Sequence, residues 1–220
     1  MAKKIKFTPR DPRFIVLTPE PATKFMPKWY RKMKSVGADS VVTAKRCVPF
    51  LDALSMGYVM PLPADVVFNS EKNEFATEAL SDIVSSHTYE QTAGIETDSI
   101  YDPKPWKWLN YFHVKTPKGY STLFIHPLNR DDLPFHSFSA VVDTDKHPLI
   151  TNFPFLMKKD FNGTILAGTP IIQMIPFKRD DWSMSVVDTD KPHMYPKEYE
   201  VMNSPLGWYR HKWWVKKKYN

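Results

Sequence analysis

The chain has 220 residues with 42% apolar and 14% aromatic content, a net charge of +6 and a single cysteine, Cys47. This length and apolar content predict one folded core and exclude an intrinsically disordered chain. A single cysteine excludes an intramolecular disulfide and a cysteine-based metal site.

Residues 1–35 hold five prolines and the basic aromatic stretch "FMPKWYRKMK". Proline disfavours regular structure, so an extended arm with one helical turn after Pro27 is predicted. The first residues lack the apolar run of a signal peptide, so secretion by that route is not expected. No stretch reaches the roughly 18 apolar residues of a membrane span, and no membrane partner is predicted.

A short apolar helix is predicted over residues 49–56, ended by Gly57, with strands at 58–60 and 65–68. The preceding Cys47 borders the apolar "VPF" run and is predicted to be a buried small side chain. Residues 69–102 are a polar insertion, in which 75–84 fit either a brief amphipathic helix or a hairpin at the rim of the core.

Alternating apolar residues predict strands in the rest of the central region. "PWKWLNYFHVKTP" and "GYSTLFIHP" are expected to form a hairpin around a turn at 116–119. Further strands are predicted in "HSFSAVVDT", "LITNFPFLM", "GTILAG" and "PIIQMIPF". Short strands bounded by Pro, Gly and Asp are typical of a sandwich or barrel.

The six residues VVDTDK occur twice, at 141–146 and 186–191. The stretches 119–132 and 168–181 that precede them share a glycine, a proline and Arg-Asp-Asp at matching positions. Two related β units predict a mainly β jelly roll or double-stranded β-helix sandwich with an internal pseudo-repeat, few short helices and extended N- and C-terminal arms. The alternative is that these acids are generic loop chemistry at strand ends and that the match is a coincidence.

The predicted organisation has three parts. Residues 1–35 form the N-terminal arm. Residues 36–191 form a single β-sandwich domain with its polar insertion near 69–102. Residues 192–220 form a proline-bearing segment and a basic aromatic C-terminal tail.

Several stretches together resemble an uncharacterised conserved protein family of marine tailed phages. They are "PEPATKFMPKWYRKM", "RCVPFLDALSMGYVMPLP", "KTPKGYSTLFIHPLNR", "VVDTD", "NFPF" and "GTPIIQMIPFKRD". The chain is more distantly similar to bacterial proteins of unknown function, and the likeness spans most of residues 18–182. The resemblance implies a shared fold and a bacteriophage origin, with the protein in the host cytoplasm or the virion. It implies no activity, because that family has none established.

The residues offer little support for catalysis. No His-Xaa-Asp or His-Xaa-Glu triplet, nucleophile elbow or glycine-rich phosphate loop occurs. Four histidines in the β region could still converge as a cupin-type site: His113, His126, His136 and His147. The weak metal candidates are His126, His136, Asp143 and Asp188. A divalent cation is therefore left open, and no cofactor is predicted.

The C-terminal stretch "LGWYRHKWWVKKKYN" carries five cations and no acid. Interleaved aromatic and basic residues can dock on a protein partner or a second copy, stack on nucleic-acid bases, or pack on the chain's own core. The predicted partner-binding residues are Trp29, Tyr30, Trp208, Tyr209, Arg210, Trp213, Trp214 and Lys216.

We therefore expect a non-enzymatic, phage-type structural or interaction protein, a virion or assembly component that binds protein partners through its arms. Binding of nucleic acid through the basic tail is left open. The alternative is a cupin-like small-molecule-binding or metal-dependent enzyme with its site between the sheets.

Overall fold

The computed structural model describes residues 3–11, 17–79, 82–186 and 209–220. The chain forms two compact units. The β unit consists of Met1–Met26, Leu54–Arg179 and Tyr219–Asn220, and the basic unit of Pro27–Ala53 and Asp180–Lys218. In this division residues 27–53 group with the C-terminal segment.

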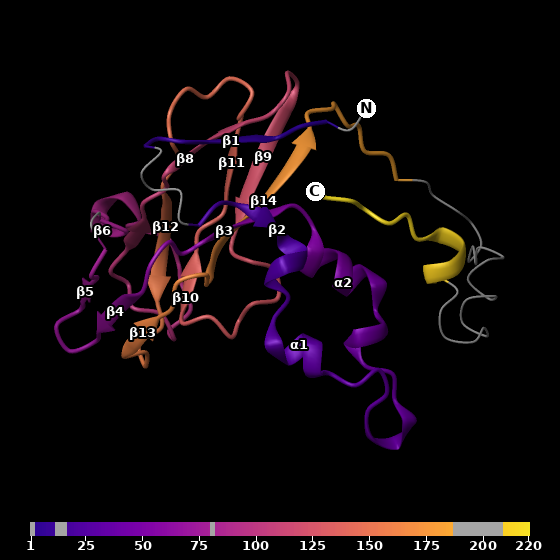
Figure 1. The fold of residues 1–220 in the computed structure, drawn as a ribbon, viewed down its shortest axis with the longest axis horizontal. Helices are drawn as coiled ribbons and strands as arrows, with labels where there is room; N and C mark the ends of the chain where they lie inside the picture. Colours follow the sequence, from indigo (N-terminus) through magenta and orange to yellow (C-terminus); the bar gives the residue numbers. More distant parts are fainter. Residues whose placement is uncertain (1–2, 12–16, 80–81, 187–208) are drawn as a thin grey trace. The chain divides into compact units, whose positions relative to one another are not determined.

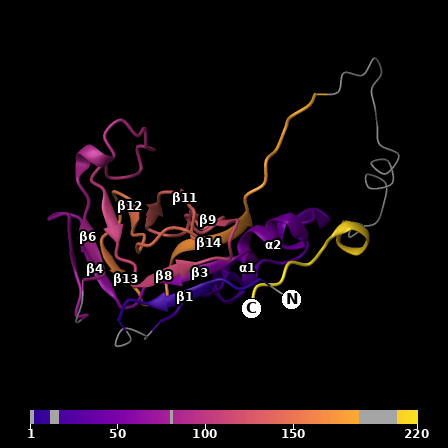
Figure 2. The same cartoon turned by 90° about the horizontal axis from the view of Figure 1, so that it is seen from above.

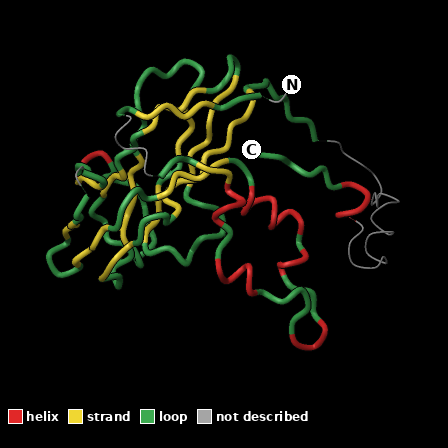
Figure 3. Tube along the Cα trace, in the orientation of Figure 1, coloured by secondary structure: helices red, strands yellow, loops and turns green. Residues whose placement is uncertain are grey.

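The β unit is built from antiparallel sheets (Figures 1 and 3). The largest has the order β11-β9-β14-β3-β2, formed by Ala140–Val142, Tyr120–Ile125, Pro170–Lys178, Tyr58–Pro61 and Glu20–Pro21. A four-stranded sheet has the order β10-β12-β7-β6, formed by Phe135–Ser137, Phe153–Met157, Trp106–Trp108 and Val84–Ser86. The smaller sheets are β13-β4-β5 (Gly163–Ile165, Val66–Asn69, Glu74–Ala76) and β1-β8 (Lys6–Pro9, Phe112–Lys115).

The strands of the described residues form no closed barrel, and helices are few and short. The prediction of a mainly β protein is thus confirmed at this level. The helices are α1 (Lys28–Lys32), α2 (Val48–Ser55), the short 3-10 turns Ala22–Phe25, Ala38–Ser40, Ala44–Arg46 and Tyr89–Gln91, and one π-helical turn, Tyr209–Trp213. None of the helices in the described part of the chain has the length and apolar composition needed to cross a bilayer.

Aromatic side chains fill the space between the two largest sheets. Phe124 of β9 lies 5.4 Å, between ring centres, from Phe153 of β12 and so joins the sheets. Trp108 of β7 stacks on Phe155 at 3.9 Å, and neither side chain is exposed to solvent. Figure 2 shows the strands of this unit from a second direction. Burial of these rings contributes to the stability of the β unit.

The two strands of the proposed repeat are direct neighbours. β9 and β14 pair antiparallel, with Tyr120 opposite Lys178. The matched glycines Gly119 and Gly168 have φ angles of +85° and +82°, a backbone conformation that favours glycine. In the first VVDTDK copy, β11 extends the sheet beside β9. In the second copy, only Val186 falls within the described residues.

The predicted hairpin at 116–119 is wrong in its pairing. β8 pairs with the N-terminal strand β1, whereas β9 pairs with β11 and β14. The physical reason lies at Thr116, whose N–H donates to Thr144 O and whose hydroxyl hydrogen-bonds to Thr144 Oγ1 at 2.7 Å. These bonds direct the chain towards the first VVDTDK loop instead of back along β8.

Other predicted elements lie closer to their observed positions. Helix α2 and strand β3 occupy the predicted ranges around Gly57, and α1 directly follows Pro27. In the polar insertion, β5 pairs with β4 and β6 pairs with β7, so the described part of residues 75–84 contains no helix and does not pair with itself as a hairpin. The prediction that Cys47 is buried is wrong, because its thiol is exposed at the chain turn before α2.

Candidate functional site

Charge is divided very unequally between the two units. The basic unit contains 13 Lys and Arg against 8 acids, a net charge of +5, while the β unit contains 17 against 16, a net charge of +1. Six of those eight acids lie between residues 180 and 200. Residues 27–53 and 209–218 therefore hold eleven cations against two acids, Asp39 and Asp52.

An aromatic cluster forms the interior of the basic unit. Tyr30 is only 3% exposed, stacks on Phe50 at 5.9 Å and meets the edge of Trp29 at 5.8 Å. Lys45 Nζ lies 4.4 Å from the centre of the Tyr30 ring and donates to Tyr30 O at 2.7 Å. Burial also raises the pKa of Tyr30. Tyr30, predicted to bind a partner, is thus enclosed by its own unit.

The C-terminal tail is anchored on α2 by one carboxylate, that of Asp52. Trp214 Nε1 donates to Asp52 Oδ2 at 2.9 Å, and Lys217 Nζ lies 2.6 Å from the same oxygen. Arg210 lies over the Trp214 ring at 5.9 Å. The last two residues belong to the β unit, where the Tyr219 ring packs on Tyr58. The tail therefore docks on its own chain, one of the three roles considered for it.

The basic unit contains all of the predicted partner-binding residues that the structure describes, from both ends of the chain. Trp29, Trp213 and Trp214 are half-buried, whereas Tyr209, Arg210 and Lys216 are exposed. Trp208 lies outside the described residues. Most aromatic rings are thus occupied by internal packing, and the exposed side chains are mainly cations.

Trp182 is, like Tyr209, an exposed aromatic side chain of this unit. Trp182 is 91% exposed, in a segment without regular structure where Met184 and Val186 are also exposed. This segment lies next to residues that are not described.

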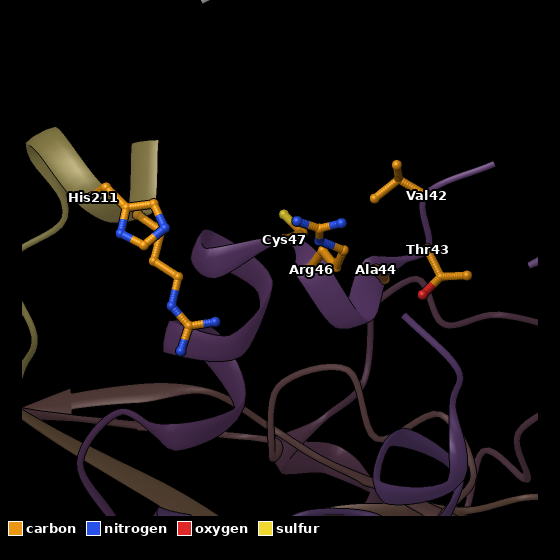
Figure 4. A pocket seen from close by; sticks show the side chains of 7 residues that line it. Val42, Thr43, Ala44, Arg46, Cys47 and His211 are labelled. Carbon is orange, nitrogen blue, oxygen red and sulfur yellow. The ribbon is translucent and has the colours of Figure 1, made fainter. Parts of the chain in front are cut away.

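A pocket of about 450 Å³ opens in the basic unit. It is lined by residues 42–44, Arg46, Cys47, Arg210 and His211. In Figure 4, Arg46 and Cys47 lie side by side, and His211 lies on a separate element. The lining contains two guanidinium groups and one imidazole and, among the described residues, no acid.

The sequence alone did not identify Arg46, Cys47 or His211 as site residues. The available signal was their basic surroundings, "KRC" near one end of the chain and "YRHKWW" near the other. Nothing in the local pattern of either stretch shows that the two meet. Their shared position at the pocket depends on the contact between Asp52, which lies close to Arg46 in sequence, and Trp214 of the distant tail.

The predicted metal candidates that the structure describes, His126, His136 and Asp143, do not assemble into one site. Within the described ranges, no three His, Cys, Asp or Glu side chains lie together as metal ligands. The four β-region histidines instead form two separate pairs. His126 and His136 stack at 4.6 Å, whereas His113 Nε2 lies 3.2 Å from His147 O. Asp188 lies outside the described residues.

His126 has both ring nitrogens engaged. Its Nδ1 accepts from Ser137 N–H at 3.3 Å, which leaves Nε2–H to donate to Arg130 O at 3.3 Å. Burial, followed by the neighbouring His136, lowers the pKa of His126 from 6.5 to about 4. Burial also lowers the pKa of His136. The pair is therefore neutral at pH 7 and has a structural role in this conformation.

This pair predicts acid sensitivity of the β unit. A folded-state pKa below the unfolded value gives stability that is present above pH 6.5 and is lost as the pH falls. The loss between pH 7 and pH 5 should be about 2 kcal/mol from His126. Denaturant unfolding at a series of pH values measures it. His126→Asn keeps an acceptor for Ser137 N–H and should make the free energy of unfolding nearly independent of pH between pH 7 and pH 5. An unchanged pH dependence in this variant would contradict the assignment of the effect to His126.

Asp143, the remaining metal candidate, belongs to a bracing network. Arg179 Nη1 donates to Asp145 Oδ1 at 2.8 Å and lies 3.2 Å from Asp143 Oδ1. Ser121 Oγ donates to Asp143 at 2.6 Å, and Gly119 N–H donates to Asp145 at 2.7 Å. The Arg179 hydrogen bonds hold the pKa of Asp145 well below its usual range. The Ser121 hydroxyl lowers the pKa of Asp143.

This network links the second Arg-Asp-Asp to the first VVDTDK. The other repeat arginine, Arg130, instead pairs with its neighbour Asp132 at 2.8 Å. In both contacts an arginine pairs with an acid of a loop at a strand end. The basic unit, with its pocket and exposed cations, is therefore the best candidate for a functional surface. No protein-family model, curated protein or solved structure matches the chain.

Proposed function

We propose that the protein is a non-enzymatic interaction protein whose basic unit binds an acidic partner. The observation that carries this proposal is the location of charge: +5 of the net +6 belongs to the basic unit. A positive surface attracts and orients a partner of opposite charge. The proposal keeps the prediction of binding through the arms and specifies the chemistry of the bound surface.

Packing within the unit explains why charge should dominate the contact. Trp214 is held by Asp52 and Tyr30 is covered by Phe50 and Lys45. An apolar docking surface would need such rings to be available to the partner. Exposed lysine and arginine heads instead suit carboxylates or phosphates.

A cupin-like enzyme has less support. The interior between the two largest sheets holds packed rings such as Trp108 and Phe155. His126 uses both nitrogens for backbone contacts. A metal or substrate there would first have to displace these interactions.

The finer fold and the biological setting are also proposals. We infer that the β unit is a divergent jelly roll or double-stranded β-helix with an internal pseudo-repeat, supported by the adjacent strands β9 and β14 and the matched glycines Gly119 and Gly168. A role as a virion or assembly component, in the phage particle or host cytoplasm, rests on the family resemblance.

Charge reversal tests the proposed function. Lys28, Lys32 and Lys34 are exposed in the basic unit, and changing all three to Glu should weaken binding to a polyanion about tenfold or more. Fluorescence anisotropy of the full chain with labelled oligothymidine and with labelled oligoglutamate measures the affinity. The same change at Lys72, Lys118 and Lys159, exposed in the β unit, is the matched control because it alters net charge equally.

A further inference from the structure

We propose that the pocket in the basic unit binds a phosphate group of single-stranded nucleic acid. This inference rests on the proposed function and names the partner of that surface. The pocket combines Arg46 and Arg210 with His211 and has a volume of about 450 Å³. Its residues come from two chain segments that are far apart in sequence.

The lining chemistry selects an anion with several acceptor oxygens. A guanidinium group offers paired N–H donors that match two phosphate oxygens, and an imidazole adds another donor or acceptor. Two arginines and a histidine provide more donors than one carboxylate can accept. A phosphodiester in a chain of phosphates also suits the eleven cations of residues 27–53 and 209–218.

The pocket's size and its neighbours favour a single strand. A pocket of this volume is in the range that holds one small ligand group, so a flexible strand can place a nucleotide in it more easily than a rigid duplex can. Tyr209 directly precedes Arg210 and is 42% exposed, so its ring can stack on a base.

Asp52 is a positioning residue for this pocket. Its carboxylate holds Trp214 and Lys217, and Trp214 in turn lies against Arg210. Loss of this anchor should release the tail residues Arg210 and His211 from the pocket. An acidic residue would thus promote the binding of an anion, which charge alone does not predict.

The first experiment compares arginines inside and outside the pocket. Arg46→Ala and Arg210→Ala should each weaken binding of the full chain to labelled oligothymidine about tenfold or more. Arg31→Ala removes the same charge from an exposed residue of α1 outside the pocket lining. This variant should weaken oligothymidine binding less than about threefold. Similar losses for all three would overturn the pocket while leaving the proposed function standing.

The second experiment separates geometry from charge. Asp52→Asn and Asp39→Asn each raise the net charge by one, but only Asp52 anchors the tail. We expect Asp52→Asn to weaken oligothymidine binding about fivefold, because it loses the Lys217 ion pair, and Asp39→Asn to leave it unchanged or slightly tighter. Circular dichroism of both variants checks that they fold. Equal tightening by both would overturn the anchored pocket.

Cys47 provides a readout that needs no substitution, because it is the only cysteine of the chain and it lines the pocket. Saturating oligothymidine should slow the reaction of Cys47 with a thiol reagent, and unchanged reactivity would contradict binding in the pocket.

Duplex DNA that binds as tightly as the single strand would overturn the single-strand assignment. Oligoglutamate that binds equally and loses affinity in the same variants would overturn the phosphate assignment. Failure of every polyanion to bind would overturn the proposed function as well.

Discussion

Trp108→Ala should lower the free energy of unfolding of the β unit by about 3–5 kcal/mol, a range typical of large aromatic truncations in a core. Trp108 is fully buried, stacks on Phe155 at 3.9 Å and meets the edge of the Phe135 ring at 5.0 Å. Truncation removes these contacts and leaves a cavity that neighbouring strands cannot easily close.

Denaturant unfolding of the full chain measures this loss. The matched control is Trp182→Ala, since Trp182 is 91% exposed and its truncation should change stability by less than about 0.5 kcal/mol. Trp108→Phe should cost less than the alanine variant, because Trp108 Nε1–H finds no acceptor among the described residues. Equal losses for the two alanine variants would show that Trp108 is not a core residue.

Gly57→Ala should also lower the free energy of unfolding. Gly57 ends α2 with a φ angle of +74°, and a Cβ added there would lie 2.2 Å from the backbone oxygen of Met174. That oxygen belongs to β14 in the middle of the five-stranded sheet, so it cannot move aside without disturbing the strand pairing. The collision should add about 1–3 kcal/mol to the backbone strain.

Gly168→Ala isolates the backbone strain alone. Gly168 has a φ angle of +82°, but its added Cβ would meet nothing within 4 Å. The strain by itself should cost about 1 kcal/mol. Thermal or denaturant unfolding should therefore show that the Gly57→Ala variant is clearly less stable than the Gly168→Ala variant. Similar stabilities would contradict the close approach of Gly57 to β14.

Local patterns predicted most strands because alternating apolar residues are a short-range signal. β12 and β14 lie where their apolar runs placed them, and α2 ends before Gly57 as expected. Pairing partners were harder to predict. β1 reaches β8 across about a hundred residues of chain, and the local turn at 116–119 could not show that Thr144 would compete for Thr116.

The candidate site was predictable in composition but not in geometry. The tail and the "KWYRK" stretch are conspicuous for their aromatic and basic residues, and the structure places both in one unit. Neither stretch indicates that Asp52 would bind Trp214, a residue 162 positions away. The pocket residues Arg46 and His211 depend on that contact, so no local pattern could reveal them.

The most direct test of the proposed binding surface compares the two lysine-to-glutamate triple variants in one binding assay at physiological ionic strength. The proposed function assigns the binding surface to the basic unit. Glu at Lys28, Lys32 and Lys34 should weaken polyanion binding by about tenfold or more relative to Glu at Lys72, Lys118 and Lys159. Equal affinities for the two variants would contradict the claim, because binding would then follow net charge instead of the basic unit.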